Sequence, residues 1–180
     1  MSAVENNSLE LVSSVIATSG DTEAFLSGMD TIDTYLLVFN NVADSDDGAS
    51  LSIQPAYNGN EEPNSTFYLA GRQLKNGTNS NQSGTNVAGK LVNYGTTGSS
   101  YESNGHAYIY INKALKDGIN DAYFRFTGFS VTYNDTDFIS HDINMQFDVA
   151  RFQANGLRLY ANSGAWDSGE FRLYKLRSGT

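Results

Sequence analysis

The stretch Ile143-Asn144-Met145-Gln146-Phe147-Asp148-Val149 decides the fold class, because apolar and polar residues alternate strictly along it. Successive side chains of a β-strand point to opposite faces, so this alternation predicts a strand with one buried face and one wetted face. The runs Ala107–Ile111 and Leu51–Ile53 repeat the pattern. The sequence therefore predicts extended strands packed around a core.

Two other segments add detail to this β pattern. Tyr35–Phe39 is apolar throughout, which is typical of a central strand covered on both faces. Within Tyr123–Tyr133, apolar residues fall at even positions before Gly128 and at odd positions after it. A one-residue change of phase at a glycine predicts a β-bulge, or a bend between two sheets, at Gly128.

The C-terminal region predicts a β-hairpin. Gly156–Tyr160 and Gly169–Tyr174 share the tripeptide Arg-Leu-Tyr, and each places large apolar residues on one face. The link between them, Ala161–Ser168, contains asparagine, serine and glycine, which favour a turn, together with Trp166.

Composition excludes several function classes. The chain has 180 residues, no cysteine, 11 Lys plus Arg and 20 Asp plus Glu, which gives a net charge of −9. Such a surface repels nucleic-acid phosphates and offers no polybasic patch to an anionic membrane, so neither partner is expected. The first ten residues lack a signal-peptide pattern, and no apolar run approaches the ~20 residues of a membrane-spanning helix.

These observations predict an all-β fold, a single-domain β-sandwich over residues 1–180 with jelly-roll topology. The alternative, an immunoglobulin-type sandwich, lacks its Cys-Trp-Cys pattern here. Residues 1–8 are expected to form an N-terminal stub. Residues 58–105 are expected to form a region of long polar loops, because they are rich in Gly and Asn. Asn112–Asn120 is the one candidate for a short helix.

The residues offer little for catalysis. The two histidines, His106 and His141, are predicted at the surface or on an edge strand. Ser140-His141-Asp142 holds the residue types of a catalytic triad, but neighbours on a strand point to opposite faces and cannot form one. No nucleophile elbow or phosphate-binding loop occurs. We therefore predict no enzyme activity, no catalytic residue and no cofactor; a glycosidase with paired carboxylates stays an alternative.

One acidic stretch resembles a calcium loop. Asp44, Asp46 and Asp47 follow the opening spacing of an EF-hand, but the glycine comes one position early and Pro55 stands in place of the bidentate glutamate. An acidic turn is the simpler interpretation. The three aspartates are kept as a weak Ca²⁺ candidate, and no metal site is predicted.

Aromatic residues are the remaining candidates for a binding site. Trp166, Tyr160 and Tyr174 could stack on sugars or on another subunit if they lie at the surface. Tyr108 and Tyr110 occupy outward positions of their strand. We interpret them as covered by loops or by a neighbouring chain.

Two separated segments resemble one protein family. Ser27–Val42 (SGMDTIDTYLLVFNNV) is similar to the pattern S-G-I-D-x-x-Y-D-x-Y-x-F-x-F-x-N-V, and Ser168–Tyr174 (SGEFRLY) is similar to the closing S-G-x-(I/F)-(K/R)-L-Y-G-(I/L). Both patterns belong to small virion structural proteins of marine bacteriophages and cyanophages, of the decoration or tail-fibre type. Lys175 departs from the pattern, which usually has glycine there.

This resemblance implies a jelly-roll-like protein on the virion surface, synthesised in the cytoplasm of a bacterial host. It leads us to expect a non-enzymatic capsid decoration or accessory protein that binds other virion proteins of the shell or tail. The alternative is a tail-fibre or receptor-binding, lectin-like domain that recognises a glycan of the host surface. A homo-oligomer is expected, a trimer being the usual expectation for such proteins.

Overall fold

The computed structural model describes residues 8–29, 32–45, 50–61, 65–86, 89–93, 104–115, 122–134, 137–149 and 154–177. In these ranges the chain forms strands and no helix, which confirms the all-β prediction. The earlier strands are β1 (Ser8–Asp21), β2 (Glu23–Ser27), β3 (Thr34–Asp44), β4 (Ser50–Tyr57), β5 (Asn60–Glu61), β6 (Ser65–Lys75) and β7 (Thr78–Asn86). The later strands are β8 (Gly89–Asn93), β9 (Asn104–Leu115), β10 (Ala122–Asn134), β11 (Asp137–Val149), β12 (Gly156–Ala161) and β13 (Trp166–Arg177).

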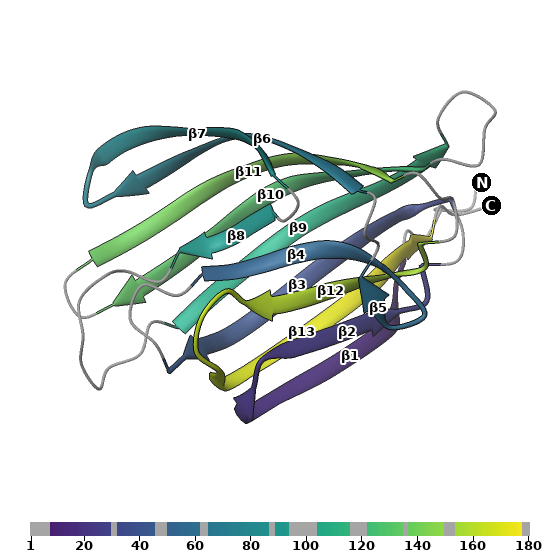
Figure 1. Cartoon of the computed structure of the whole chain (residues 1–180), viewed down its shortest axis with the longest axis horizontal. Coiled ribbons are helices and arrows are strands. Elements are labelled where there is room, and N and C mark those ends of the chain that lie inside the picture. Colours follow the sequence, from purple (N-terminus) through teal and green to yellow (C-terminus); the bar gives the residue numbers. More distant parts are fainter. Residues whose placement is uncertain are drawn as a thin grey trace, which may run out of the picture.

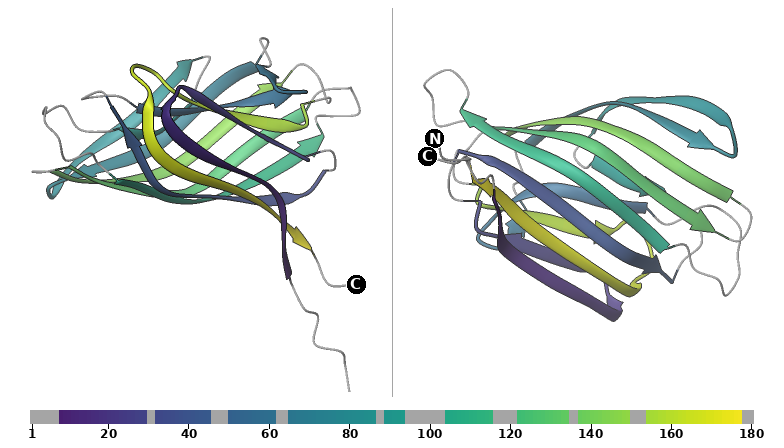
Figure 2. Two further views of the ribbon diagram at one scale, coloured as in Figure 1. Left: turned by 90° about the horizontal axis from the view of Figure 1, so that it is seen from below. Right: turned by 180° about the vertical axis from the view of Figure 1, so that it is seen from behind.

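The strands form two antiparallel sheets that pack face to face as a sandwich (Figure 1). The eight-stranded sheet has the order β1-β13-β3-β9-β10-β11-β6-β7. The five-stranded sheet has the order β2-β12-β4-β5, with β8 also paired to β4. Figure 2 shows the smaller sheet as a second layer over the larger one. We call the side of the eight-stranded sheet that faces away from the smaller sheet its outer face.

Four strands of each sheet follow jelly-roll order. These are β1-β13-β3-β9 in the larger sheet and β2-β12-β4-β8 in the smaller one. When these eight strands are numbered 1 to 8 in chain order, the larger sheet reads 1-8-3-6 and the smaller sheet reads 2-7-4-5. This is the order of a jelly roll, which is built from two Greek keys. Strands β10, β11, β6 and β7 extend the larger sheet beyond this unit.

The core lies between the inner faces of the two sheets, where the alternation predicts it. Ile143, Met145 and Phe147 of β11 are buried, whereas Asn144 between them is exposed. On β3, which lies between β13 and β9, Tyr35, Leu37 and Phe39 are fully buried. Leu157 and Leu159 reach the core from one sheet, and Phe171 and Leu173 reach it from the other.

The predicted β-bulge or bend between sheets at Gly128 is wrong, because β10 lies within one sheet along its whole length. Strand β10 keeps one register from Ala122 to Tyr133 against both neighbours. The even positions stay on the inner face after Gly128, so Ser130 and Thr132 are buried and Phe129 is exposed. The change of phase therefore does not come from the backbone. After Gly128, apolar side chains such as Phe129 lie on the outer face of the sheet, and the inner face carries small polar ones. Gly128 has a packing reason instead, because a Cβ there would collide with the carbonyl oxygen of Tyr108 on β9.

The predicted C-terminal hairpin is also wrong. Strand β12 belongs to the five-stranded sheet and β13 to the eight-stranded sheet, so the link between them crosses the sandwich. The similar apolar faces of the two segments meet at the core from opposite layers. Periodicity alone cannot distinguish this arrangement from a hairpin, because both bury the same residues.

The region 58–105 contains more strand than predicted. Strands β6 and β7 form a hairpin, in which the pairing runs from Phe67 opposite Asn86 to Lys75 opposite Thr78. Its turn is Asn76-Gly77, with φ values of 47° and 83°, which suit a two-residue turn of type I′. The proposed helix is wrong over Asn112–Leu115, which ends β9; residues 116–120 and the stub residues 1–7 lie outside the described residues. Ser8 already belongs to β1.

Candidate functional site

The outer face of the eight-stranded sheet carries a continuous set of apolar and aromatic side chains, which we call the outer apolar patch. Its members come from β1, β13, β3, β9 and β10: Leu9, Leu11, Leu36, Tyr108, Tyr110, Phe129, Tyr174 and Leu176. Strand alternation creates the patch, because the neighbours of these residues along each strand point to the opposite, inner side of the sheet.

Strand register aligns the patch in rows across the sheet. Leu11 lies opposite Tyr174, Tyr174 opposite Leu36, and Leu36 opposite Tyr110. In the next row Tyr108 lies between Val38 and Phe129. Directly opposite residues of antiparallel strands have Cβ atoms about 4.5–5.5 Å apart. Each row is therefore a line of touching side chains.

Three rings of the patch are largely accessible. Tyr108, Tyr110 and Phe129 have relative exposures of 49%, 51% and 48%. The centroids of the Tyr108 and Phe129 rings are 5.9 Å apart with a tilt of 36°, which is within the range of favourable aromatic pairs. The prediction that Tyr108 and Tyr110 point outward is confirmed. Within the described chain the two rings are exposed, so any cover over them would have to come from elsewhere.

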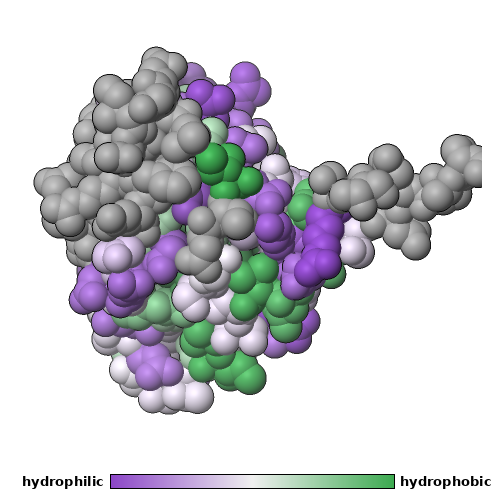
Figure 3. All heavy atoms as spheres, turned by 90° about the vertical axis from the view of Figure 1, so that its right-hand side faces the viewer, coloured by the Kyte–Doolittle hydropathy of each residue, from purple (hydrophilic) through white to green (hydrophobic). Residues whose placement is uncertain are grey.

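A hollow of about 470 Å³ lies at the end of the patch where β1 begins and β13 ends. Its lining includes Leu9, Thr34, Leu36, Tyr110, Leu176 and Arg177. Figure 3 views this end of the molecule and shows apolar side chains gathered among polar ones. The outer apolar patch is thus concave at one end.

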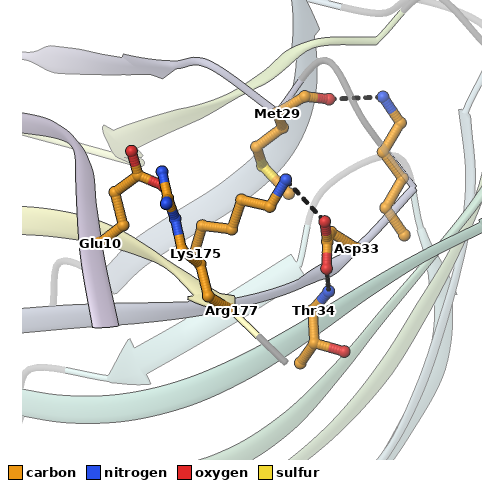
Figure 4. Close-up of polar contacts among 7 residues, drawn as sticks. Glu10, Met29, Asp33, Thr34, Lys175 and Arg177 are labelled. Carbon is orange, nitrogen blue, oxygen red and sulfur yellow. Dashed lines mark hydrogen bonds and ion pairs between the residues drawn. The ribbon is translucent and has the colours of Figure 1, made fainter. Parts of the chain in front are cut away.

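Two ion pairs adjoin this hollow, because Asp33 and Arg177 are among its lining residues; Figure 4 shows the four side chains. Lys175 Nζ lies 2.7 Å from Asp33 Oδ2, and Arg177 Nε donates to Glu10 Oε2 at 2.6 Å. The hydrogen bond to Asp33 raises the pKa of Lys175, and the hydrogen bond from Arg177 lowers the pKa of Glu10. Both pairs are partly exposed, so they contribute little to stability. The two positive and two negative charges cancel, so the ion pairs add no net charge beside the hollow.

A buried lysine closes the core at the same end. Lys113 Nζ donates hydrogen bonds to the carbonyl oxygens of Met29 (2.5 Å) and Ala154 (2.8 Å), and it lies 5.8 Å from the centroid of the Phe124 ring. It thereby ties two connecting segments to β9. Sequence analysis missed this role, although position 113 continues the inner-facing series Ala107, Ile109 and Ile111.

The structure does not bring the three predicted binding aromatics together. Trp166 is fully buried and packs on Phe171 with ring centroids 5.0 Å apart. Its role as a surface aromatic is therefore corrected: it opens β13 and belongs to the core. Tyr160 is half-buried on β12 beneath the guanidinium of Arg158, 4.6 Å from its ring. Tyr174 is half-buried and is the one of the three that joins the outer apolar patch.

The histidines lie on opposite faces of the large sheet. His141 points inward on β11, which is an interior strand, so its predicted surface or edge-strand position is wrong. Burial lowers the pKa of His141 to about 4, and its Nδ1 lies 3.5 Å from Ser130 Oγ. Asp142 is exposed on the other face, as strand alternation predicts. His106 points outward and lies 3.5 Å from Asn40 Oδ1.

The calcium candidate is only partly described. Asp44 ends β3 and is buried opposite Trp166, whereas Asp46 and Asp47 lie outside the described residues. In the ranges that the structure covers, no three His, Cys, Asp or Glu side chains gather as a metal site would require. The same ranges contain no helix with the length and apolar character needed to span a membrane.

Comparisons with known proteins find no matching family model, no matching curated protein and no matching solved structure. The resemblance of Ser27–Val42 and Ser168–Tyr174 to virion proteins stays a prediction.

Proposed function

We propose that this protein is a non-enzymatic structural component of the exterior of a bacteriophage particle, a capsid decoration or accessory protein that binds other virion proteins. Docking takes place through the outer apolar patch. The single observation that carries the proposal is the exposure of Tyr108, Tyr110 and Phe129, each about half exposed, on one face of one sheet. Exposed apolar patches with polar rims mark protein-binding surfaces.

The patch has the anatomy of a protein interface. Its centre is aromatic and aliphatic, and its margin contains uncharged or ion-paired polar residues such as Asn112, Thr127 and Arg172. Arg172 lies 2.6 Å from Glu170, so its charge is already balanced on the free protein. Interfaces of this kind combine a core enriched in Tyr, Phe and Arg with a polar rim.

Overall charge suits a protein displayed in many copies. A net charge of −9 keeps neighbouring copies soluble at high local concentration. A location on the tail instead of the capsid shell would use the same surface. A homo-oligomeric state is part of the proposal.

A second function, recognition of a host-surface glycan by a tail-fibre or receptor-binding domain, is favoured by the same rings. Tyrosine rings flanked by amide and hydroxyl side chains can stack on sugar faces while neighbouring groups bind sugar hydroxyls. Asn112 and Thr127 supply such groups beside Tyr110. Trp166 is not available for this role, because it is buried.

The test is binding of the purified protein to particles of the phage that encodes it. We expect the wild-type protein to co-sediment with the particles, and Tyr110→Lys to reduce retention at least tenfold. Tyr68→Lys is the matched control, since Tyr68 is 49% exposed on β6, three strands away in the same sheet. Equal retention of both variants contradicts docking by the patch. Retention on bacterial surface polysaccharide instead of particles would favour the glycan function.

A further inference from the structure

We propose that β1 pairs antiparallel with β1 of a second copy of this chain, so that two eight-stranded sheets join edge to edge. Strand β1 is one edge of the larger sheet, paired on one side by β13. An edge strand presents a row of unpaired backbone N–H and C=O groups, and a strand from another chain is what it takes to continue that ladder of hydrogen bonds. This requirement identifies the occupant as a polypeptide strand.

The two edges of the eight-stranded sheet differ in character. The opposite edge, β7, has the sequence TNSNQSGTN and contains no apolar residue. Strand β1 exposes Leu9, Leu11 and Ile16, with relative exposures of 54%, 53% and 72%. Natural proteins protect solvent-facing edges with polar or charged residues. The apolar edge at β1 is therefore the one suited to being covered.

The occupant that fits is β1 itself, about a two-fold axis between Val12 and Ser13. The register of β1 shifts between Leu11 and Ser13, so the axis passes through an existing irregularity. The axis places Leu9 opposite Ile16 of the second copy and Leu11 opposite Ser14. All four residues lie on the outer face, because their partners on β13 have even numbers from Glu170 to Leu176. The two faces thus match without any change of register.

Charge permits this contact between two acidic chains. Ser8–Ala17 contains a single acidic residue, Glu10, which is paired with Arg177 at 2.6 Å. About the proposed axis, Glu10 lies opposite Val15 of the second copy, and both side chains are on the inner side of the sheet. No acidic side chain meets another along this segment. The outer apolar patches of the two copies also become one surface, since Leu11 belongs to the row of Tyr174 and Leu36.

The first test is the mass of the intact protein in solution. Light scattering after size exclusion should give twice the 19.6 kDa of one chain. Ile16→Glu should weaken association at least tenfold by placing an unpaired charge in the interface. Asn79→Glu, an identical change of charge on β7, should leave the mass unchanged. Circular dichroism and the melting temperature verify that each variant is folded. A monomer at all concentrations, a trimer, or equal masses for both variants overturns the proposal.

The second test fixes the register and uses the fact that the chain contains no cysteine. Directly opposite residues have Cα atoms about 4.5–5.5 Å apart, within disulfide range. Positions 9 and 16 of one strand are roughly 23 Å apart, too far to bridge within a copy. Oxidation of Leu9→Cys/Ile16→Cys should give a covalent dimer, and Leu9→Cys/Asn79→Cys should stay monomeric on a non-reducing gel. No covalent dimer, or the same yield from both variants, overturns the pairing. Loss of particle binding would contradict only the proposed function.

Discussion

The indole ring of Trp166 packs against the phenyl ring of Phe171, with centroids 5.0 Å apart and an interplanar angle of 47°. Both side chains are fully buried, and Phe39 continues the contact from β3, 6.0 Å from Phe171. The residue that opens β13 is thus a core residue. The crossing between the two sheets is held by an aromatic cluster.

Replacement of Trp166 should destabilise the fold. We expect Trp166→Ala to lower the free energy of unfolding by about 3–5 kcal/mol, because it removes a large buried side chain and leaves a cavity. Trp166→Phe, which keeps an aromatic ring, is the control and should cost less. Urea titration followed by circular dichroism measures both. A loss below about 1 kcal/mol for the alanine variant would mean that the indole is not buried in solution.

Gly128 should be intolerant of a side chain. A Cβ at this position meets the Tyr108 carbonyl oxygen and lies 2.7 Å from Ile109 Cα, so Gly128→Ala must push β10 away from β9. We expect a destabilisation of about 1–3 kcal/mol, typical of overpacking. Thr127→Ala, at the exposed neighbouring position on β10, should change the free energy of unfolding by less than about 0.5 kcal/mol. Equal effects of the two alanines would contradict the close approach of the strands.

Stability should fall with acid in a way that depends on His141. Burial lowers the pKa of His141 from 6.5 to about 4 in the folded protein. Between pH 6.5 and 4, His141 is therefore protonated in the unfolded chain but neutral in the folded chain. The free energy of unfolding falls as the pH drops through this range. This loss amounts to roughly 3 kcal/mol from the size of the shift.

The measurement is urea unfolding at pH 7, 6, 5 and 4. His141→Gln should flatten the decline between pH 6.5 and 4, and His106→Gln, the outward-facing control, should leave it in place. Parallel pH profiles for the wild type and His141→Gln would show that His141 is accessible to protons in the folded state.

Alternation in the sequence was sufficient to predict the strands and their buried faces wherever one face is apolar. Ile143, Met145 and Phe147 illustrate this success. Alternation was not sufficient to predict the pairing of β12 and β13. It identifies the apolar face of each strand, but it does not indicate to which of the two sheets the strand belongs. Strand β7 has no apolar face at all, and its pairing rests on backbone hydrogen bonds and on the Asn76-Gly77 turn. Asn-Gly is a recognised hairpin signal, so this hairpin could have been predicted from the sequence alone.

The candidate site was only partly predictable. Periodicity placed Tyr108 and Tyr110 on an outward face, and the structure agrees. It could not show that Tyr174 and Leu36 lie in the same row, because that neighbourhood depends on the order of β13, β3 and β9 in the sheet. The burial of Trp166 could not be predicted from alternation, because Trp166 is the first residue of β13 and follows a turn. Its burial follows from the crossing of the chain between the sheets.

The most direct test of docking by the outer apolar patch is hydroxyl-radical footprinting of the protein on the particle, read by mass spectrometry. Tyr108 and Tyr110 should react readily in the free protein and become protected on the particle. Tyr68, equally exposed on the same sheet but outside the patch, should react equally in both states. Unchanged reactivity of Tyr108 and Tyr110 on particles that carry the protein would contradict the account.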